Sequence, residues 1–217
     1  TVVSPSYSDL LSIEEEGETT VSARKMSELC RSLPDAENVD FMLKDGKLTV
    51  SSKNFHGDFA TISADDFPEL EVNEDQETAE ISSGALKRIL TKTAFSMASQ
   101  DVRYYLNGLL LELSGGELKG VATDGHRLAL SSVETKGNGL EMRNILPRKA
   151  VLELAKLLSA EDSSIEMLVG STYMGIKTEN LIFSSKLIDG KYPDYEKVFP
   201  SGEPLPLLVG KETLQSA

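Results

Sequence analysis

The sequence contains one cysteine, two histidines and no tryptophan among its 217 residues. A single cysteine excludes a disulfide framework. The lack of disulfides is typical of a protein from a reducing cytoplasm. Two histidines, His56 and His126, exclude a histidine-rich metal site. Cys30 lies between Leu29 and Leu33 on an apolar helix face, so we expect it to be a small buried hydrophobic residue.

Long apolar runs and enzyme signatures are also missing. No run approaches the roughly 18 apolar residues that span a bilayer, and no signal peptide opens the chain. Cys-x-x-Cys, Walker A and GxSxG patterns are absent. We therefore expect a cytoplasmic protein with no membrane partner, no metal and no cofactor. The start at Thr1 and the helix-like residues 211–217 suggest a piece of a longer chain.

One pattern occurs four times, about 60 residues apart: a short apolar strand, a small or polar cap, and an amphipathic helix. The strands are predicted at 19–22, 79–82, 144–147 and 207–210. Apolar residues at i, i+3, i+4 and i+7 predict helices at 24–33, 86–97 and 151–158, and a fourth beginning near Lys211. Ser22 and either Ser82 or Ser83 suit N-caps, and Pro147 suits a first helical turn.

Strands and tight turns are predicted between the helices. Asp45-Gly46 is a strong hairpin signal between strands at 39–43 and 47–51. Strands at 109–113 and 118–122 flank residues 114–117, and a third meander is predicted at 165–169, 173–178 and 181–185. Each repeat is thus one helix with about three antiparallel strands, which is an α+β fold class.

Two repeats are needed for a domain, because one helix and three strands cannot bury their own apolar faces. About 125 residues is a natural domain size. We therefore predict the second half of a domain at 1–76, a complete domain at 77–203 and the start of a third domain at 204–217. In the complete domain, the two helices should lie antiparallel on one face, and two antiparallel sheets should cover the other side. Linkers are predicted at 69–80 and 201–206.

Positive charge is concentrated in the helices of an acidic chain. The chain holds 22 basic and 35 acidic residues, a net charge of −13, which by itself argues against a nucleic-acid partner. The three helices, taken as 22–33, 83–99 and 147–160, hold nine basic and two acidic residues. Lys and Arg are good helix formers, but Glu is equally good. The pattern favours a basic face that meets phosphates without reading bases.

Three runs are distinctive: Asp-Val-Arg-Tyr-Tyr-Leu-Asn-Gly at 101–108, Thr-Asp-Gly-His-Arg-Leu-Ala at 123–129, and 185–195 with 198–200. Together they closely resemble the beta subunit of bacterial DNA polymerase III, the sliding clamp, and the similarity is dense from Thr19 to Pro200. The resemblance implies the DNA-clamp fold and a non-catalytic, three-domain protomer. Two protomers would form a homodimeric ring around double-stranded DNA, with helices facing the hole. Against that pattern, half of the first domain and most of the third are missing.

The resemblance also implies two sets of site residues. The DNA-facing positions are Arg24, Arg31, Gln100, Arg103, Tyr104, Arg148 and Lys149. For Tyr104 and Tyr105, packing in the core remains an equal alternative. A pocket would receive short motifs of replicative and translesion polymerases, the clamp loader, mismatch-repair and other proteins, and its positions are Leu106, Thr123, Gly125, His126, Arg127, Leu128, Pro193, Lys197 and Val198.

The residue chemistry is compatible with a peptide site. Leu106, Leu128, Pro193 and Val198 would supply apolar area. Asp124-Gly125 is predicted to form a tight turn that leaves His126 and Arg127 at the rim, although a plain hairpin turn has the same signature. Lys197 stands where the family commonly has Arg, and a Lys lacks the planar donor fork.

Two other functions are compatible with parts of the sequence. A hydrolase could be built on Asp124 and His126 with Asp189 or Asp194, but it would need a nucleophile or a second carboxylate brought close by the fold. A peptide-binding or structural module without a DNA role is the other alternative, and the basic helices argue against it.

Overall fold

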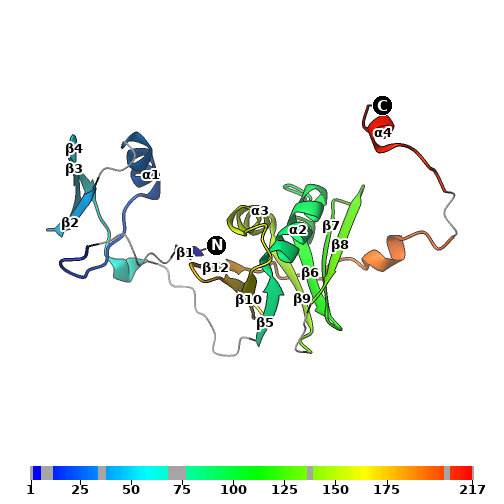
Figure 1. The fold of residues 1–217 in the computed structure, drawn as a ribbon. Coiled ribbons are helices and arrows are strands. Elements are labelled where there is room, and N and C mark those ends of the chain that lie inside the picture. Colours follow the sequence, from blue (N-terminus) through cyan, green and yellow to red (C-terminus); the bar gives the residue numbers. More distant parts are fainter. Residues whose placement is uncertain are drawn as a thin grey trace.

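The computed structural model describes residues 2–5, 12–33, 38–67, 77–135, 139–202 and 206–216. The first helix and meander form a small unit in which a three-stranded antiparallel sheet, ordered β2-β3-β4, stands beside α1 (Figure 1). Asp45 and Gly46, both with positive φ, make the predicted turn between β2 and β3. The elements of this unit are α1 (Ala23–Ser32), β2 (Asp40–Lys44), β3 (Lys47–Ser52), β4 (Phe55–Ala60) and the 3₁₀ turn η1 (Ala64–Asp66).

The central part of the chain contains two complete repeats. The first consists of β5 (Glu77–Ser82), α2 (Ser83–Thr93), the 3₁₀ turns η2 (Ala94–Ser96) and η3 (Tyr104–Leu106), β6 (Gly108–Ser114), β7 (Glu117–Thr123) and β8 (Leu128–Glu134). The second consists of β9 (Met142–Pro147), α3 (Arg148–Leu157), β10 (Ser164–Val169), β11 (Tyr173–Lys177) and β12 (Leu181–Lys186). The 3₁₀ turn η4 (Tyr195–Val198) and the short helix α4 (Lys211–Ser216) follow.

The two central repeats exchange their leading strands. The four-stranded sheet has the order β8-β7-β6-β9, and the five-stranded sheet has the order β1-β12-β11-β10-β5, where β1 is Val2–Pro5. The leading strand β9 of the second repeat therefore pairs with β6 of the first, and β5 pairs with β10. All these pairings are antiparallel. The exchange is the physical reason that two repeats fold as one domain.

The helices α2 and α3 lie side by side on one side of the strands (Figure 1). Lys87, early in α2, donates from Nζ to the carbonyl of Leu158 at the end of α3, at 2.8 Å. Arg148, at the start of α3, donates from Nη1 to the carbonyl of Met97 beyond the end of α2, at 3.3 Å. The start of each helix is thus tied to the end of the other, which confirms the predicted antiparallel pair and the α+β fold.

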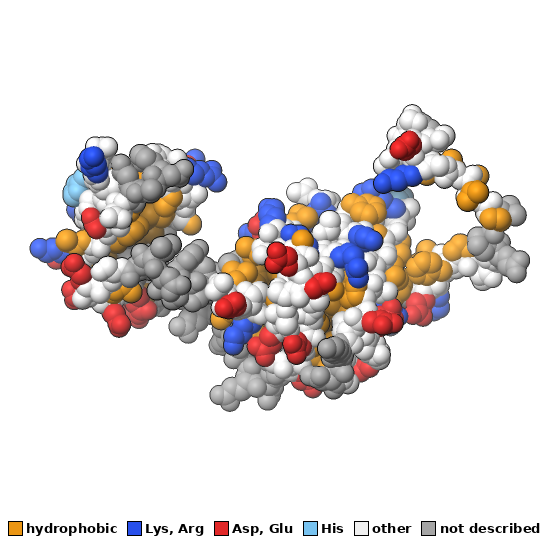
Figure 2. Space-filling model, in the orientation of Figure 1, with side chains coloured by type: hydrophobic (Ala, Val, Ile, Leu, Met, Phe, Trp, Pro, Cys, Tyr) orange, Lys and Arg blue, Asp and Glu red, His pale blue; other side chains and the backbone are white. Residues whose placement is uncertain are grey.

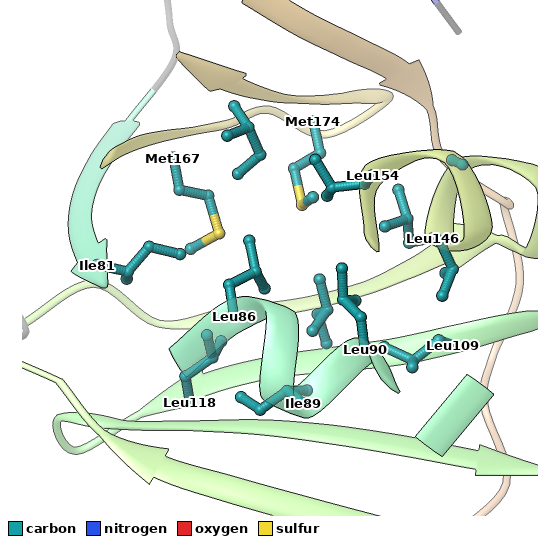
Figure 3. Close-up of a cluster of buried hydrophobic side chains, with 14 of the residues drawn as sticks. Ile81, Leu86, Ile89, Leu90, Leu109, Leu118, Leu146, Leu154, Met167 and Met174 are labelled. Carbon is teal, nitrogen blue, oxygen red and sulfur yellow. The ribbon is translucent and has the colours of Figure 1, made fainter. Parts of the chain in front are cut away.

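The main core lies between this helix pair and the two sheets. Figure 3 shows Leu86, Ile89 and Leu90 of α2 pointing toward side chains from both sheets and from α3. These three leucine and isoleucine side chains are fully buried. Gly120 of β7 is required by this packing, because a Cβ there would stand 2.2 Å from Cγ2 of Ile89. The apolar periodicity of α2 therefore marks its buried face.

Cys30 is exposed, so the prediction that it is buried is wrong. The apolar cluster around α1 draws on Leu29 and on that unit's own sheet and flanking residues, and Cys30 is not part of it. At the equivalent positions of the other repeats, Leu90 belongs to the core that α2 and α3 share, and Ala155 packs against that core. Cys30 has the same position in the helical pattern but no comparable cover.

Several boundaries also differ from the predictions. The helix predicted to reach Met97 ends at Thr93 and continues as η2. Pro147 is the N-cap of α3 rather than part of its first turn, and Ser22 makes no capping hydrogen bond, whereas Ser82 accepts one from the backbone of Ala85. Residues 19–22 form only an isolated bridge from Thr20 to Ile62, and residues 207–210 form no strand. Of the predicted linkers, residues 69–76 and 203–205 lie outside the described residues, and residues 77–80 belong to β5 rather than to a linker.

Candidate functional site

The turn between β7 and β8 is fixed by its own side chains. The Asp124 carboxylate accepts from the backbone N–H groups of His126 at 2.9 Å and Arg127 at 3.0 Å. Thr123 Oγ1 donates to the carbonyl of Arg127 and accepts from the N–H of Gly125, whose φ is +87°. The two backbone bonds are the main reason that the pKa of Asp124 is held below its usual value. The predicted tight turn is therefore present, with His126 and Arg127 exposed.

An apolar cluster lies beside this turn on the side of the sheet away from the helix pair. Leu106 is almost fully buried in it, and the partly buried Leu128 packs against it. Tyr192 is buried there as well, and its hydroxyl accepts from the backbone N–H of Thr123 at 3.1 Å. Burial raises the pKa of Tyr192 to about 12. Leu106 therefore forms the interior of this region, while Leu128 reaches its surface.

The segment after Tyr192 carries the remaining residues of the predicted pocket. Pro193 and Val198 are both exposed, and Val198 has 67% of its surface accessible. Lys197 forms an ion pair with Asp194 at 2.9 Å, which lowers the pKa of the Asp194 carboxyl. Tyr195 is buried in the same cluster as Leu106. The structure thus brings Leu128, Thr123 and the 193–198 segment together around one cluster, although the segment lies about 70 positions further along the sequence.

The loop at 98–107 carries three of the predicted DNA-facing residues, and it is tightly braced. Asn107 exchanges two hydrogen bonds with the backbone of Asp101, at 2.8 and 2.9 Å. The carboxylate of Asp101 accepts from the backbone N–H, Nε and Nη2 of Arg103, and the side-chain bonds are the main reason that the pKa of Asp101 falls to about 2. Gln100 is exposed and adopts a φ of +58°.

Arg103 connects this loop to the β7–β8 turn. Its Nη2 also donates to the carbonyl of Asp124, at 3.3 Å. Since its guanidinium is already bound to Asp101 and Asp124, Arg103 has fewer donors left for phosphate than the sequence suggests. Tyr104 is 57% exposed and stands edge-on to Tyr105, so packing in the core does not account for it.

Arg148 and Lys149 begin α3 and differ in their surroundings. Arg148 is half-buried and donates to the carbonyls of Ala94 and Met97, whereas Lys149 is exposed. The backbone N–H of Arg148 donates to the carbonyl of Asn107, which places the start of α3 next to the 98–107 loop. On the visible face of this domain, most Lys and Arg side chains lie over the α2 and α3 region, and Asp and Glu are more numerous toward the strands (Figure 2).

Arg24 and Arg31 lie on α1, in the first unit, and are exposed. Arg24 pairs with Glu28 one helical turn away, at 3.0 Å between Nε and Oε1. An exposed pair of this kind contributes little to stability. Both side chains are therefore available to a partner.

Sequence reasoning missed four residues of this region: Phe95, Asp101, Asn107 and Tyr192. Three of them lie inside the distinctive runs, so their position in those runs was the available signal. Tyr192 contacts the backbone of Thr123, which is distant in sequence, and no local pattern encodes such a contact. Asp101 and Asn107 make their contacts within the 98–107 loop. Phe95 had no signal, since a phenylalanine near the end of an apolar stripe is normally part of the core.

Two helices on one side of two antiparallel sheets, built from two repeats that exchange strands, define a DNA-clamp fold. The chain belongs to the DNA polymerase III beta subunit family: the family's central domain matches residues 80–194, and its N-terminal domain matches residues 3–71. The helices that the structure describes are all too short or too polar to span a bilayer.

Known relatives are bacterial sliding clamps. The beta sliding clamp of Pseudomonas aeruginosa is 40% identical over 204 residues, which is 94% of this chain and 56% of that protein. The crystal structure of the DNA polymerase III subunit beta from Pseudomonas aeruginosa has a TM-score of 0.83 at 42% identity, over 89% of this chain and 53% of that one. A Bacillus subtilis sliding clamp has a TM-score of 0.82 at 27% identity, over 88% and 50%. The chain thus spans about half the length of these relatives.

Proposed function

We propose that this chain is part of a DNA sliding clamp subunit that acts in the bacterial cytoplasm. In this role it encircles double-stranded DNA without reading its sequence and tethers other replication proteins to it. Residues 1–76 would be the second half of the first clamp domain, residues 77–203 the second domain, and residues 204–217 the start of the third. Two full-length protomers would close the ring. Double-stranded DNA, replicative and translesion polymerases, the clamp loader and mismatch-repair proteins are the proposed partners.

The observation that carries this proposal is the basic helix pair in an acidic protein. Arg88, Lys92, Lys149 and Lys156 are all exposed on α2 and α3, and only Lys156 among them has an acidic partner in the described part of the chain. Phosphates attract such a face at long range, and the acidic sheet side repels them. A molecule with one basic and one acidic side meets DNA in one orientation, which suits a ring wall.

The proposed protein pocket rests on the cluster around Leu128. Leu128 directly follows the fixed Thr123–Arg127 turn and packs against the buried cluster of Leu106 and Tyr192, and the exposed Val198 ends η4, whose Tyr195 belongs to the same cluster. A pocket whose walls are already ordered loses little entropy when a peptide binds. Apolar anchor side chains would supply most of the affinity, and His126 and Arg127 would orient the peptide.

A non-catalytic role is part of the proposal. A hydrolase would use Asp124 as a base or nucleophile, but both of its oxygens are engaged with the turn: Oδ1 with two backbone N–H groups and Oδ2 with Arg127. Its lowered pKa also makes it a poor proton acceptor. Asp124 is therefore better suited to holding the turn than to chemistry.

The DNA role is tested by charge reversal in a ring that contains this sequence. Lys149→Glu on α3 should weaken the retention of the ring on circular duplex and reduce the salt dependence of that retention, because one phosphate contact is lost. Lys177→Glu on β11 is the matched control, because it makes the same charge change on a sheet. The 217-residue chain alone should bind linear duplex weakly. Equal effects of the two variants, or sequence-selective binding by the chain alone, would refute the DNA assignment.

The pocket is tested with a peptide that carries a glutamine followed by spaced leucine and phenylalanine anchors. In an NMR titration it should shift signals of Thr123, Leu128 and Val198, and Leu128→Asp should remove binding because a charge would stand where an apolar anchor packs. Leu157→Asp, at an exposed leucine of α3, is the control. Shifts confined to other regions, or unchanged binding by Leu128→Asp, would show that the pocket lies elsewhere.

A further inference from the structure

Phe95 is an exposed phenylalanine just beyond α2 whose ring supports an arginine. Its side chain is 58% accessible, and the Cζ atom of Arg127 stands 5.5 Å from the ring centroid. A guanidinium within about 6 Å of an aromatic face is attracted to the electron density of the ring. Phe95 in η2 therefore contacts a residue of the β7–β8 turn, 32 positions further along the chain.

Arg127 is held from a second direction by Asp124. Its Nε donates to Oδ2 of Asp124 at 3.0 Å. The hydrogen bond to Asp124 fixes the Nε edge of the guanidinium, and the Phe95 ring fixes its plane. Within the part of the chain that the structure describes, no hydrogen bond joins Nη1 or Nη2 of Arg127 to a protein acceptor. The outer edge of the fork is thus free to bind a ligand.

We propose that Phe95 is a positioning residue of the peptide pocket, which holds the Arg127 guanidinium so that its free edge binds a carboxylate beside the apolar anchors of a bound peptide. The inference rests on the proposed peptide-binding function and adds a preference to it. Peptides with an acidic residue next to their anchors bind better than those with a neutral one, and Phe95 sets the size of that preference.

A carboxylate of a peptide fits the position of Arg127. Leu128 follows Arg127 directly and packs against the Leu106 and Tyr192 cluster, so an acidic residue next to an apolar anchor reaches the guanidinium. A guanidinium binds a carboxylate through two parallel hydrogen bonds, which demand a defined plane. A fork that is oriented before binding loses less side-chain entropy on forming these bonds.

The experiment uses the 217-residue chain and two synthetic peptides. Both carry the glutamine, leucine and phenylalanine anchors; one has an aspartate beside them, and the other has an asparagine. Titration calorimetry gives the affinity ratio of the two peptides for each variant. The variants are Phe95→Leu, which keeps apolar volume but removes the ring face, Phe95→Tyr, which keeps the ring, Arg127→Met, and the double variant Phe95→Leu/Arg127→Met.

Phe95→Leu should reduce affinity for the aspartate peptide about two- to fivefold, the usual range for an exposed cation–π contact, and leave the asparagine peptide unchanged. Phe95→Tyr should restore the preference. In the Arg127→Met background, Phe95→Leu should have no further effect. Phe41→Leu is the matched control, because Phe41 has a similar accessible fraction, 55%, and lies on β2.

Proton NMR tests the arrangement without a peptide. The Arg127 side-chain protons should be shifted upfield by the Phe95 ring, and this shift should disappear in Phe95→Leu and persist in Phe95→Tyr. A loss of affinity for both peptides alike in Phe95→Leu would show a plain apolar contact and overturn the proposal. An unchanged aspartate preference would also overturn it.

Two further outcomes separate this proposal from the function on which it rests. If the unmodified chain binds neither peptide, the pocket assignment itself is wrong, whatever the Arg127 proton shifts show. If Phe95→Leu and Arg127→Met weaken retention of a ring on duplex and leave the peptide ratio unchanged, the free edge of Arg127 binds phosphate rather than a peptide carboxylate. Either result rejects the carboxylate assignment.

Discussion

Replacing Tyr192 with phenylalanine removes one hydroxyl on which the candidate pocket depends. The Tyr192 side chain is 3% accessible, and its hydroxyl is the acceptor for the half-buried backbone N–H of Thr123 at 3.1 Å. Phenylalanine keeps the ring packing and leaves that N–H without its partner. A buried donor that loses its acceptor costs about 1–3 kcal/mol. Because Thr123 is only half-buried, we expect a loss in the lower half of that range.

The alkaline pH dependence gives the same residue a second signature. The pKa of Tyr192 is raised from 10.0 to about 12 by burial. Because the folded-state pKa lies above the unfolded one, the contribution of this group to stability is complete below pH 10 and is lost as the pH rises from 10 to about 12. The loss is at most about 1.4 kcal/mol for each pH unit in that window. Tyr192→Phe has no such loss, so wild type and variant should converge above pH 10.

Hydrogen exchange at neutral pH measures the first effect within the central domain, and urea unfolding at a series of pH values measures the second. The amides of Leu110 and Val121, in the paired strands β6 and β7, report the free energy of opening of this domain. At neutral pH the variant should exchange faster at these amides and most strongly at Thr123. Equal protection of the Thr123 amide in both proteins would refute the hydrogen bond. Parallel stability profiles above pH 10 would refute the burial argument for the phenol.

Three other predictions follow from individual contacts. Gly120→Ala should destabilise the central domain by about 1–3 kcal/mol in urea unfolding, because its Cβ would overlap Ile89; an unchanged midpoint would contradict the close packing of β7 on α2. The Asp101 carboxyl should titrate near pH 2 by carbon NMR, so its stabilising contact with Arg103 is complete above pH 3.8 and lost as the pH falls toward 2; an Arg103→Gln variant should move the titration upward. Cys30 should react with a maleimide in the native protein, since it is exposed; protection until unfolding would show that something covers it.

The repeat in the sequence predicted the elements and the fold class well. The apolar spacing of Leu86, Ile89 and Leu90 identified the buried face of α2, because a helix can bury only the side chains that share one stripe. Asp45-Gly46 and residues 114–117 marked hairpins because those turns need positive φ angles, which glycine and aspartate tolerate. These are local requirements, so local sequence is enough to reveal them.

The same apolar spacing gave the wrong prediction at Cys30, because the burial of a helix face depends on which segments pack against it and not only on the residues of that face. Cys30 and Leu90 occupy equivalent helical positions, yet one is exposed and the other is fully buried. The surroundings of Arg103 were hidden for a similar reason: its sequence neighbours do not reveal that its guanidinium reaches the carbonyl of Asp124.

Sequence alone therefore determined the repeat, most of the secondary structure, the segregation of charge and the resemblance of the motif runs to one family. Only the tertiary structure decided which of these residues meet. The exchange of β5 and β9 between repeats, the support of Thr123 by Tyr192 and the contact of Phe95 with Arg127 all join residues that are distant along the chain. Such contacts form because burying apolar faces brings segments together, and the partners of each polar group are then set by geometry that no local pattern records.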